Sequence, residues 1–385
     1  MNLNNETSHL TKFNASQLSR YAHESALTVY GWDSRWNDVL RGLGPANDGW
    51  QPARVVAQHS HSYQLMTTEG ESIATVSGKF AFAAQRPSDF PAVGDWVLAQ
   101  PLTGESRSVI HALLPRRTAM TRRAAGNVDE EQVIGANVDT LFVTSALNLE
   151  FNVRRIERFL IAAWESGASP VVLLTKADLC PDPEALRAQV ERAAPGVPVH
   201  IVSAMRDEGM EQLAPYLRPG ATIAVAGSSG VGKSTLLNWL AGESRMSTSG
   251  IREADARGRH TTTHRELFPL PGGTLVIDTP GMRELQLWDS QDGWQQAFAD
   301  VETLAARCRF RDCRHEAEAG CAVAEAIAGG ELDAARLVNY KKTARELERQ
   351  ANKASKAPSK SPKAGKSSPA RSRKHRARFE DEAFD

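Results

Sequence analysis

The sequence has few cysteines and no long apolar run. Only four of its 385 residues are cysteine, too few for the disulfide framework typical of small secreted domains. No stretch of about 18 apolar residues occurs, as a membrane-spanning helix would need. The first twenty residues are polar, so no signal peptide is predicted. These absences lead us to expect a cytoplasmic protein with no membrane association.

The chain also lacks net charge, but this balance conceals an asymmetry. Basic and acidic residues both number 46. Residues 341–378 hold 14 basic and two acidic residues, a charge of +12, so the remainder of the chain carries −12. The basic segment is rich in Lys, Ser, Pro and Ala, a composition typical of a disordered tail. The tail offers candidate contacts to nucleic acid phosphates, namely Arg371, Arg373, Lys374, Arg376 and Arg378.

Composition and periodicity predict five segments. Residues 1–50 form a polar extension with no periodic element, and residues 51–115 contain short β-type runs that indicate a small all-β barrel. Residues 116–287 alternate apolar strands with helical segments, the pattern of an α/β domain with a parallel sheet. Residues 288–340 are predicted to be helical around a cysteine cluster, and residues 341–385 form the basic tail.

A glycine-rich loop between a predicted strand and a predicted helix is the clearest sign of a ligand site. It reads Gly-x-x-x-x-Gly-Lys-Ser, a nucleoside triphosphate motif whose backbone amides and following helix bind phosphate. Lys233 is expected to act as a catalytic residue that spans the β- and γ-phosphates, and Ser234 to bind Mg²⁺. The candidate nucleotide-binding residues are Gly227, Ser228, Ser229, Gly230, Val231, Gly232, Lys233, Ser234 and Thr235.

Two loops at successive strand ends indicate that the base is guanine. The Asp178 carboxylate can accept hydrogen bonds from the ring N–H and the exocyclic amine of guanine, a donor pair that adenine lacks. This argues against an ATP-using protein. The motif is Thr-Lys-x-Asp, whereas most GTPases have Asn at its first position. Ligands bind at the carboxyl ends of parallel strands, so we expect a base site formed by Thr175, Lys176, Asp178, Ser203 and Ala204.

Two further segments are typical of nucleotide-sensing switches. In the sequence Asp-Thr-Pro-Gly, Asp278 is expected to contact Mg²⁺, usually through water, and Gly281 the γ-phosphate. Residues 258–264 form a polar loop in which Thr262 is the candidate Mg²⁺ ligand and catalytic residue, its threonine neighbours remaining alternatives. Many small GTPases have a water-orienting Gln after the Gly, but this chain has Met. We therefore expect slow intrinsic hydrolysis, with His260 as the candidate replacement; a solvent-exposed loop histidine is the alternative.

Three cysteines and a histidine lie close together in the predicted helical segment. Thiolates and an imidazole are the ligands of closed, tetrahedral structural zinc sites. A reduced cluster without metal is the alternative, and Cys180 is expected to be a lone packed thiol. The candidate zinc ligands are Cys308, Cys313, His315 and Cys321.

The order of the motifs is rotated relative to ordinary GTPases, in which the phosphate loop precedes the guanine motifs. Here Thr-Lys-Ala-Asp and Ser-Ala come first, so the domain is circularly permuted, as the proximity of domain termini allows. Together with the phrase EEQVIGANVDTLFVTSALN, the VGDWV of the barrel and the Cys/His cluster, this order resembles the RsgA/YjeQ family over residues 30–340.

The resemblance implies an oligonucleotide-binding-type (OB-type) barrel, a permuted GTPase core and a zinc domain. It also implies a monomeric GTPase with Mg²⁺ that binds the 30S ribosomal subunit and its 16S rRNA during late maturation. In that family the histidine at the place of His260 is regarded as catalytic. Small barrels commonly bind oligonucleotides, and Arg54, Lys79 and Arg86 are candidate RNA contacts. The rival hypothesis is an RNA-binding assembly factor with a vestigial nucleotide site.

Overall fold

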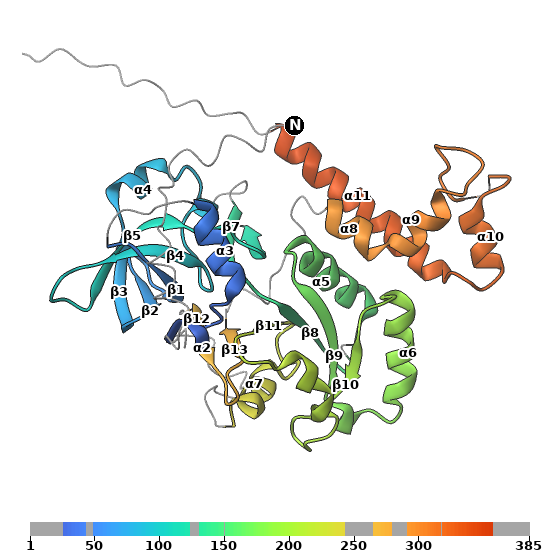
Figure 1. Cartoon of the computed structure of the whole chain (residues 1–385). Coiled ribbons are helices and arrows are strands. Elements are labelled where there is room, and N and C mark those ends of the chain that lie inside the picture. Colours follow the sequence, from blue (N-terminus) through green and yellow to red (C-terminus); the bar gives the residue numbers. More distant parts are fainter. Residues whose placement is uncertain are drawn as a thin grey trace, which may run out of the picture.

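The computed structural model describes residues 26–43, 49–123, 131–149, 151–242, 265–278, 291–316 and 318–356. Five short strands near the N-terminus close into a barrel (Figure 1): β1 (Gln51–Gln58), β2 (Tyr63–Thr67), β3 (Gly70–Val76), β4 (Trp96–Pro101) and β5 (Arg107–Leu113). They are ordered β1-β2-β3-β5-β4, and β4 pairs back onto β1. Apolar side chains such as Val55, Leu65 and Ile110 fill the interior, because alternate strand residues face inward. Helix α4 (Gly78–Ala83) and the 3₁₀ turn η1 (Pro87–Asp89) connect β3 to β4. The predicted OB-type barrel is confirmed.

The predicted α/β fold is also confirmed. Five parallel strands form its sheet: β8 (Thr140–Ala146), β9 (Ser169–Thr175), β10 (Val199–Ile201), β11 (Thr222–Ala226) and β13 (Leu275–Asp278). Their runs of apolar residues are buried on both faces, as parallel strands require. Helices α5 (Val153–Glu165) and α6 (Pro183–Ala193) cover one face, and α7 (Lys233–Ala241) and the 3₁₀ helix η3 (Met210–Tyr216) the other.

Three strands of this region were not foreseen from the sequence. The hairpin of β6 (Ala119–Arg123) and β7 (Glu131–Ala136) lies at the start of this region and forms a separate two-stranded sheet. Strand β12 (Arg265–Pro269) runs antiparallel to β13. One edge of β1 pairs with β2, and the opposite edge pairs with two strands. On that opposite edge the first residues of β1 pair with β4, and the last two pair with β12. The barrel and the α/β sheet are therefore one continuous sheet of eleven strands.

Part of the N-terminal segment packs into the core. Helices α2 (Ala26–Val29) and α3 (Ser34–Leu43) bring the buried Trp32 and Trp36 against Trp96 of the barrel, with ring centroids 4.8 and 5.8 Å from the Trp96 ring. The expectation that this segment lacks periodic structure is wrong for residues 26–43. Helix α2 has only four residues and is too short to show a sequence period, whereas α3 does place Trp36, Leu40 and Leu43 at helical spacing, a signal that the sequence prediction missed.

Arg54 does not belong to an RNA-binding surface. Its side chain is 1 % exposed and donates hydrogen bonds to the Tyr30 carbonyl (2.8 Å) and to Oγ1 of Thr222 on β11 (3.2 Å). It also lies over the Trp96 ring, 4.9 Å from the centroid. Burial lowers the pKa of Arg54 to about 9, so the guanidinium remains charged at neutral pH. The expectation that Arg54 contacts RNA is wrong, because this arginine joins the N-terminal segment, the barrel and the α/β sheet.

We expect Arg54→Ala to lower the melting temperature of the protein. The substitution removes both hydrogen bonds and leaves a cavity beside Trp96, a combination that costs about 2–4 kcal/mol. Thermal unfolding followed by circular dichroism measures the effect. Lys79→Ala is the control, because Lys79 is an exposed basic residue of the same barrel. If both variants melt within about 2 °C of the wild type, the role assigned to Arg54 is wrong.

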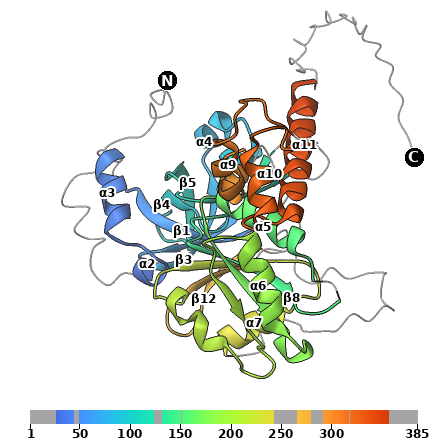
Figure 2. The same cartoon turned by 90° about the vertical axis from the view of Figure 1, so that its right-hand side faces the viewer.

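The C-terminal helices pack on one side of the α/β sheet, over α5 (Figures 1 and 2). They are α8 (Gln291–Ala297), α9 (Ala299–Ala305), α10 (Ala322–Ala328) and α11 (Ala334–Lys356). Their apolar core includes Phe298, Val301 and Val323, and it extends to Ile161 of α5. The structure thus has helix over residues 341–356, where a disordered tail was expected. The buried Thr343 and the partly buried Leu347 of α11 face the body of the protein there.

A buried ion network joins α5 to these C-terminal helices. The Arg336 guanidinium contacts Oε1 of Glu157 on α5 at 2.5 Å and Oδ1 of Asp300 on α9 at 2.9 Å. The Asn339 amide donates to the other oxygen of Glu157. Because Arg336 and Glu157 are both buried, removal of Arg336 would leave the Glu157 carboxylate without its cationic partner, which is costly.

Candidate nucleotide-binding site and metal centre

The loop after β11 can be formed only with glycine at key positions. Gly227, Gly230 and Gly232 have φ values of +147°, +78° and +96°, a region that other residues avoid. A Cβ on Gly227 would also lie 2.3 Å from Oγ1 of Thr144. The loop therefore turns directly into α7, and its amides and the helix N-terminus form a site suited to an anion.

Lys233, the first residue of α7, folds back over this loop. Its Nζ donates to the carbonyl oxygens of Gly227 (2.7 Å) and Ser228 (2.5 Å). The positive charge thus lies beside the loop amides, where it would attract phosphate oxygens. The next residue, Ser234, is on the same first turn of α7.

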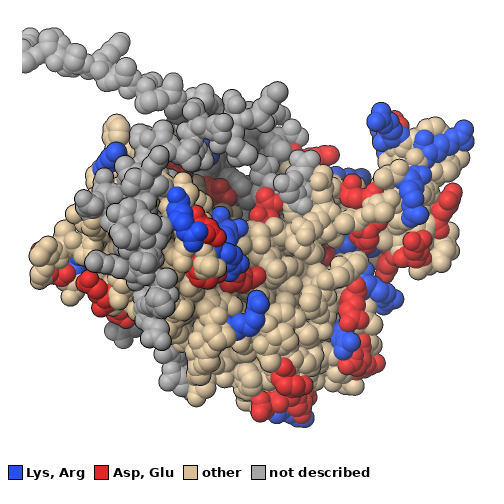
Figure 3. All heavy atoms as spheres, in the orientation of Figure 1, with Lys and Arg blue, Asp and Glu red and all other residues tan. Residues whose placement is uncertain are grey.

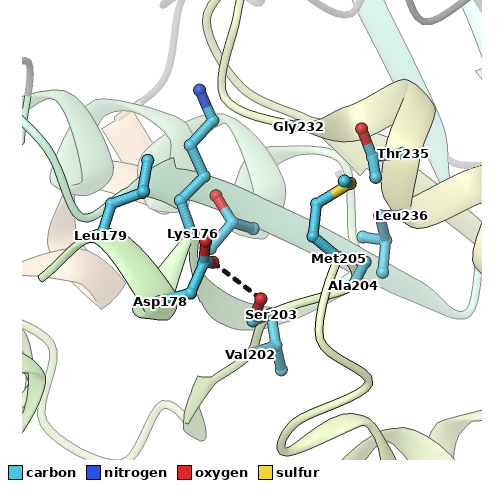
Figure 4. A pocket seen from close by; sticks show the side chains of 11 residues that line it. Lys176, Asp178, Leu179, Val202, Ser203, Ala204, Met205, Gly232, Thr235 and Leu236 are labelled. Atoms are coloured by element: carbon cyan, nitrogen blue, oxygen red, sulfur yellow. Dashed lines mark hydrogen bonds between the residues drawn. The ribbon is translucent and has the colours of Figure 1, made fainter.

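A pocket of about 170 Å³ opens beside the loop (Figure 4). Its walls come from the residues that follow β9, the residues that follow β10 and the start of α7. The lining residues are Thr175, Lys176, Asp178, Leu179, Val202, Ser203, Ala204, Met205, Gly232, Thr235 and Leu236. All five residues expected to bind the base therefore lie around one pocket, next to the phosphate loop.

The Asp178 carboxylate is held in place inside this pocket. Ser203 Oγ donates to Oδ1 of Asp178 at 2.7 Å, as the dashed line in Figure 4 shows. Ser203 is 1 % exposed, so a buried hydroxyl group fixes the orientation of the Asp178 carboxylate. Lys176 takes the left-handed conformation, with φ of +59°, and this turns the chain sharply at the end of β9. The sharp turn presents Asp178 to the pocket.

Thr175 links the base pocket to the phosphate loop. Its hydroxyl donates to the carbonyl oxygen of Val231 at 2.6 Å. Both residues are buried, so the bond is shielded from water. This contact was not foreseen, because a sequence motif does not reveal which carbonyl its side chain reaches.

The sequence suggested two Mg²⁺ ligands that fall in the described part of the chain. Asp278 ends β13, the parallel neighbour of β11, and Ser234 follows the loop after β11. Their oxygen atoms are the hard donors that Mg²⁺ prefers, and both belong to carboxyl ends of adjacent strands. His260, Thr262 and Gly281 lie outside the described residues.

Arg155 is a residue at the phosphate loop that the sequence did not reveal. It lies in the first turn of α5, where Asn152 caps the helix, and its Nη1 donates to Ser228 Oγ at 3.1 Å. No motif marks it, because the two residues are 73 positions apart in the chain. Helix α5 thus touches the phosphate loop through Arg155 and the C-terminal helices through Glu157.

The predicted zinc ligands converge on one point. The ligand atoms of Cys308, Cys313, His315 and Cys321 all lie within 4.8 Å of one another. Sγ of Cys308 is 3.9 Å from Sγ of Cys321, and both are 3.6 Å from Nδ1 of His315. Tetrahedral zinc with ordinary bond lengths implies about 3.8 Å between sulfurs and about 3.5 Å between sulfur and nitrogen. The cluster therefore fits a zinc ion.

Burial and hydrogen bonds affect the ionisation of these thiols. Burial raises the pKa of Cys308, but hydrogen bonds from the backbone amides of Val323 and Ala322 at the start of α10 lower it. The net shift of the pKa is downward. A backbone hydrogen bond at His315 lowers the pKa of Cys313, yet burial and the neighbouring thiols raise it to about 11. Ionising Cys313 beside the neighbouring thiols thus calls for a nearby cation, as a structural zinc provides.

Exposed arginines surround this metal centre. They alternate with its ligands in the run R-C-R-F-R-D-C-R-H. The sequence prediction used the cysteines and the histidine of this run but missed its arginines. Phe310 is 47 % exposed beside the Arg309 guanidinium, which is 5.5 Å from its ring centroid. The exposed basic residues of this run are Arg307, Arg309, Arg311 and Arg314.

The fold and the site define a class of protein. A strand, phosphate loop and helix placed after the base-recognition loops, on a parallel sheet, make this chain a circularly permuted P-loop GTPase. Among the described residues no helix is long and apolar enough to cross a membrane.

Comparison with known proteins gives the family. The model of the RsgA GTPase family matches residues 113–288. The chain is 47 % identical over 330 residues to the small ribosomal subunit biogenesis GTPase RsgA of Opitutus terrae, covering 83 % of this chain and 89 % of the relative. It is 45 % identical over 338 residues to the RsgA of Streptomyces coelicolor, covering 87 % and 90 %. The chain therefore belongs to the RsgA GTPase family and is a GTP-hydrolysing enzyme, as its resemblance to that family implied.

Solved structures agree with the fold. The crystal structure of YjeQ from Thermotoga maritima superposes with a TM-score of 0.60 at 28 % identity and covers 78 % of this chain and 99 % of that one. YloQ, a circularly permuted GTPase, superposes with a TM-score of 0.56 at 24 % identity, with 79 % and 96 % covered.

Proposed function

We propose that this enzyme binds the small (30S) ribosomal subunit during its late maturation, hydrolyses GTP there at a rate that the subunit stimulates, and dissociates afterwards. The observation that carries the proposal is the similarity of this chain to relatives that are named small ribosomal subunit biogenesis GTPases. The similarity covers most of the length of these relatives. GTP and the 16S rRNA of the subunit are the partners, and the enzyme acts as a cytoplasmic monomer.

The nucleotide site supports specific roles for its residues. Asp178 accepts the N1–H and N2–H of guanine, and the Ala204 amide faces the guanine O6. Lys233 holds the β- and γ-phosphates, and its existing position over the phosphate loop supports this role. Ser234, Asp278 and Thr262 hold Mg²⁺, which neutralises phosphate charge when bound. Gly281 contacts the γ-phosphate, and His260 orients the attacking water.

Surface charge supports an RNA partner. Lys and Arg side chains gather at the end of the C-terminal helices, near α9 and α10 (Figure 3). The exposed arginines around the zinc ligands, together with Lys79 and Arg86 of the barrel, are suited to phosphate contacts that weaken as salt rises. Zinc bound by Cys308, Cys313, His315 and Cys321 would hold the arginine-bearing loop in a fixed shape.

GTP turnover with and without purified small ribosomal subunits tests the proposal. We expect slow release of phosphate from the enzyme alone and a rise of at least about tenfold with small subunits, since an activator can supply several kcal/mol of transition-state stabilisation. Large subunits serve as the control for nonspecific RNA. Lys233→Ala should remove the stimulated turnover, because the substitution removes the charge beside the phosphates.

Three outcomes would contradict the proposal. A rate that stays flat with small subunits would point to another activator. Unchanged turnover in Lys233→Ala would exclude the assigned role of Lys233. If the protein binds small subunits but shows no turnover at all, the rival hypothesis of an RNA-binding factor with a vestigial nucleotide site is favoured.

A further inference from the structure

The hydroxyl group of Thr175 donates its one proton to a hydrogen bond inside the protein. A threonine hydroxyl has one proton to donate, and that of Thr175 points at the Val231 carbonyl, 2.6 Å away. The only other carbonyl near this hydroxyl in the described residues belongs to Ser145, at 3.4 Å. Thr175 is 6 % exposed and Val231 5 %. Breaking their bond would leave a buried carbonyl without a partner, which is costly, so the bond should persist when nucleotide binds.

Thr175 lies where the N7 edge of a bound guanine is expected. This step rests on the proposed function, which places the N1 and N2 edge of guanine at Asp178. Around the purine ring, O6 follows N1, N7 follows O6, and the bond to the sugar and phosphates comes next. The base therefore presents N7 between the Ala204 loop and the phosphate loop. Thr175 lines the pocket between these two loops and is bonded to the second of them.

N7 is an acceptor and needs a donor from the protein. Three lining residues carry hydroxyl groups: Thr175, Ser203 and Thr235. The Ser203 hydroxyl donates to Asp178. Thr235 lies on the first turn of α7, the phosphate-binding end, and in Figure 4 its hydroxyl points away from Ser203 and Ala204. The ammonium of Lys176 also extends away from these residues.

We propose that Thr175 makes this GTPase indifferent to N7 of guanine. The enzyme recognises the base through its N1, N2 and O6 positions alone. An asparagine at position 175 would behave differently, because its amide has two N–H groups. One could bond to the Val231 carbonyl and the other to N7. Residue 175 thus determines whether nucleotides that lack the N7 acceptor are accepted.

The test compares the dissociation constants of GDP and 7-deaza-GDP, in which a C–H group replaces N7. Isothermal titration calorimetry with the full chain measures both, and diphosphates avoid turnover. For the wild type we expect the two constants to agree within about twofold, since no hydrogen bond is lost. For Thr175→Asn we expect 7-deaza-GDP to bind about 3- to 10-fold more weakly than GDP, the worth of one hydrogen bond.

Thr175→Val is the matched control. Valine has nearly the same shape as threonine but no hydroxyl, so it removes the bond to Val231 without adding a donor for N7. Both ligands should bind this variant more weakly, by the same factor. A wild-type enzyme that binds 7-deaza-GDP about fivefold or more weakly than GDP would overturn the inference, as would a Thr175→Asn variant that treats both ligands alike.

Failure of this inference can be told apart from failure of the proposed base site. Asp178→Asn should weaken GDP binding if guanine lies where we propose. If that variant binds GDP normally, the base site itself is wrong. If it binds GDP weakly while the wild type still discriminates against 7-deaza-GDP, only the inference about N7 is wrong.

Discussion

Asp178→Asn is expected to weaken GDP binding about 100-fold or more and to create affinity for xanthosine diphosphate. Guanine presents two N–H donors to the carboxylate, and each hydrogen bond to a charged acceptor contributes about 1.5–3 kcal/mol. An asparagine amide can accept one of these bonds, but its N–H₂ group then faces the guanine amine. Xanthine has a carbonyl in place of that amine, so it matches the amide. Calorimetric titration with both diphosphates measures the exchange.

Asp182→Asn is the matched control for this prediction. Asp182 is an exposed carboxylate four positions further along the chain, outside the pocket, and it caps α6 through the Ala185 amide. Asparagine is an equally good cap, so this variant makes the same charge change without touching the base. If Asp182→Asn weakens GDP binding as much as Asp178→Asn does, the effect is electrostatic and the assigned contact is wrong.

Cys321→Ser is expected to abolish zinc binding and to unfold the region around α9 and α10. Structural zinc contributes about 10–16 kcal/mol of apparent folding free energy in small zinc domains. Cys321 is 1 % exposed and also caps α10, since its Sγ accepts from the Ala324 amide. Serine is a preferred helix cap, so the substitution removes a metal ligand and keeps the cap. Zinc content should fall from one ion per chain to nearly none.

Limited proteolysis should show the structural consequence of this change. We expect cleavage near the metal ligands in Cys321→Ser, and in the wild type after strong chelation, while the α/β core stays protected. Cys180→Ser should retain full zinc content, because Cys180 is not part of the cluster. A wild-type protein purified without chelator that holds no zinc, or a Cys321→Ser variant that keeps it, would show that the cluster is not a zinc site.

The sequence predicted the parts of the site whose chemistry is local. The glycine pattern of the phosphate loop requires a particular backbone, and the structure has positive φ at Gly227, Gly230 and Gly232. The cysteines and histidine likewise converge as their residue types indicated. Alternating strands and helices were sufficient to predict the sheet, because parallel strands need helical connections.

Contacts between distant segments could not be predicted in the same way. Arg54 looked like any basic residue of a nucleic-acid-binding barrel, and only its contacts with Tyr30 of the N-terminal segment and with Thr222 of β11 show that it is buried. Arg155 and Thr175 each contact the phosphate loop over a long stretch of sequence. The part of α11 after residue 340 is polar enough to resemble a tail, yet it continues an ordered helix.

The shared edge of β1 has a consequence for any attempt to study the GTPase core alone. Truncation that removes the barrel would uncover the side of β12 that now pairs with Ala57 and Gln58. An uncovered strand edge offers unpaired amides and carbonyls to another molecule, which favours edge-to-edge aggregation. The barrel thus covers the outer edge of the catalytic sheet at Arg265 and Glu266, and an excised core would rely on these two charges and on Pro269 to oppose edge-to-edge association.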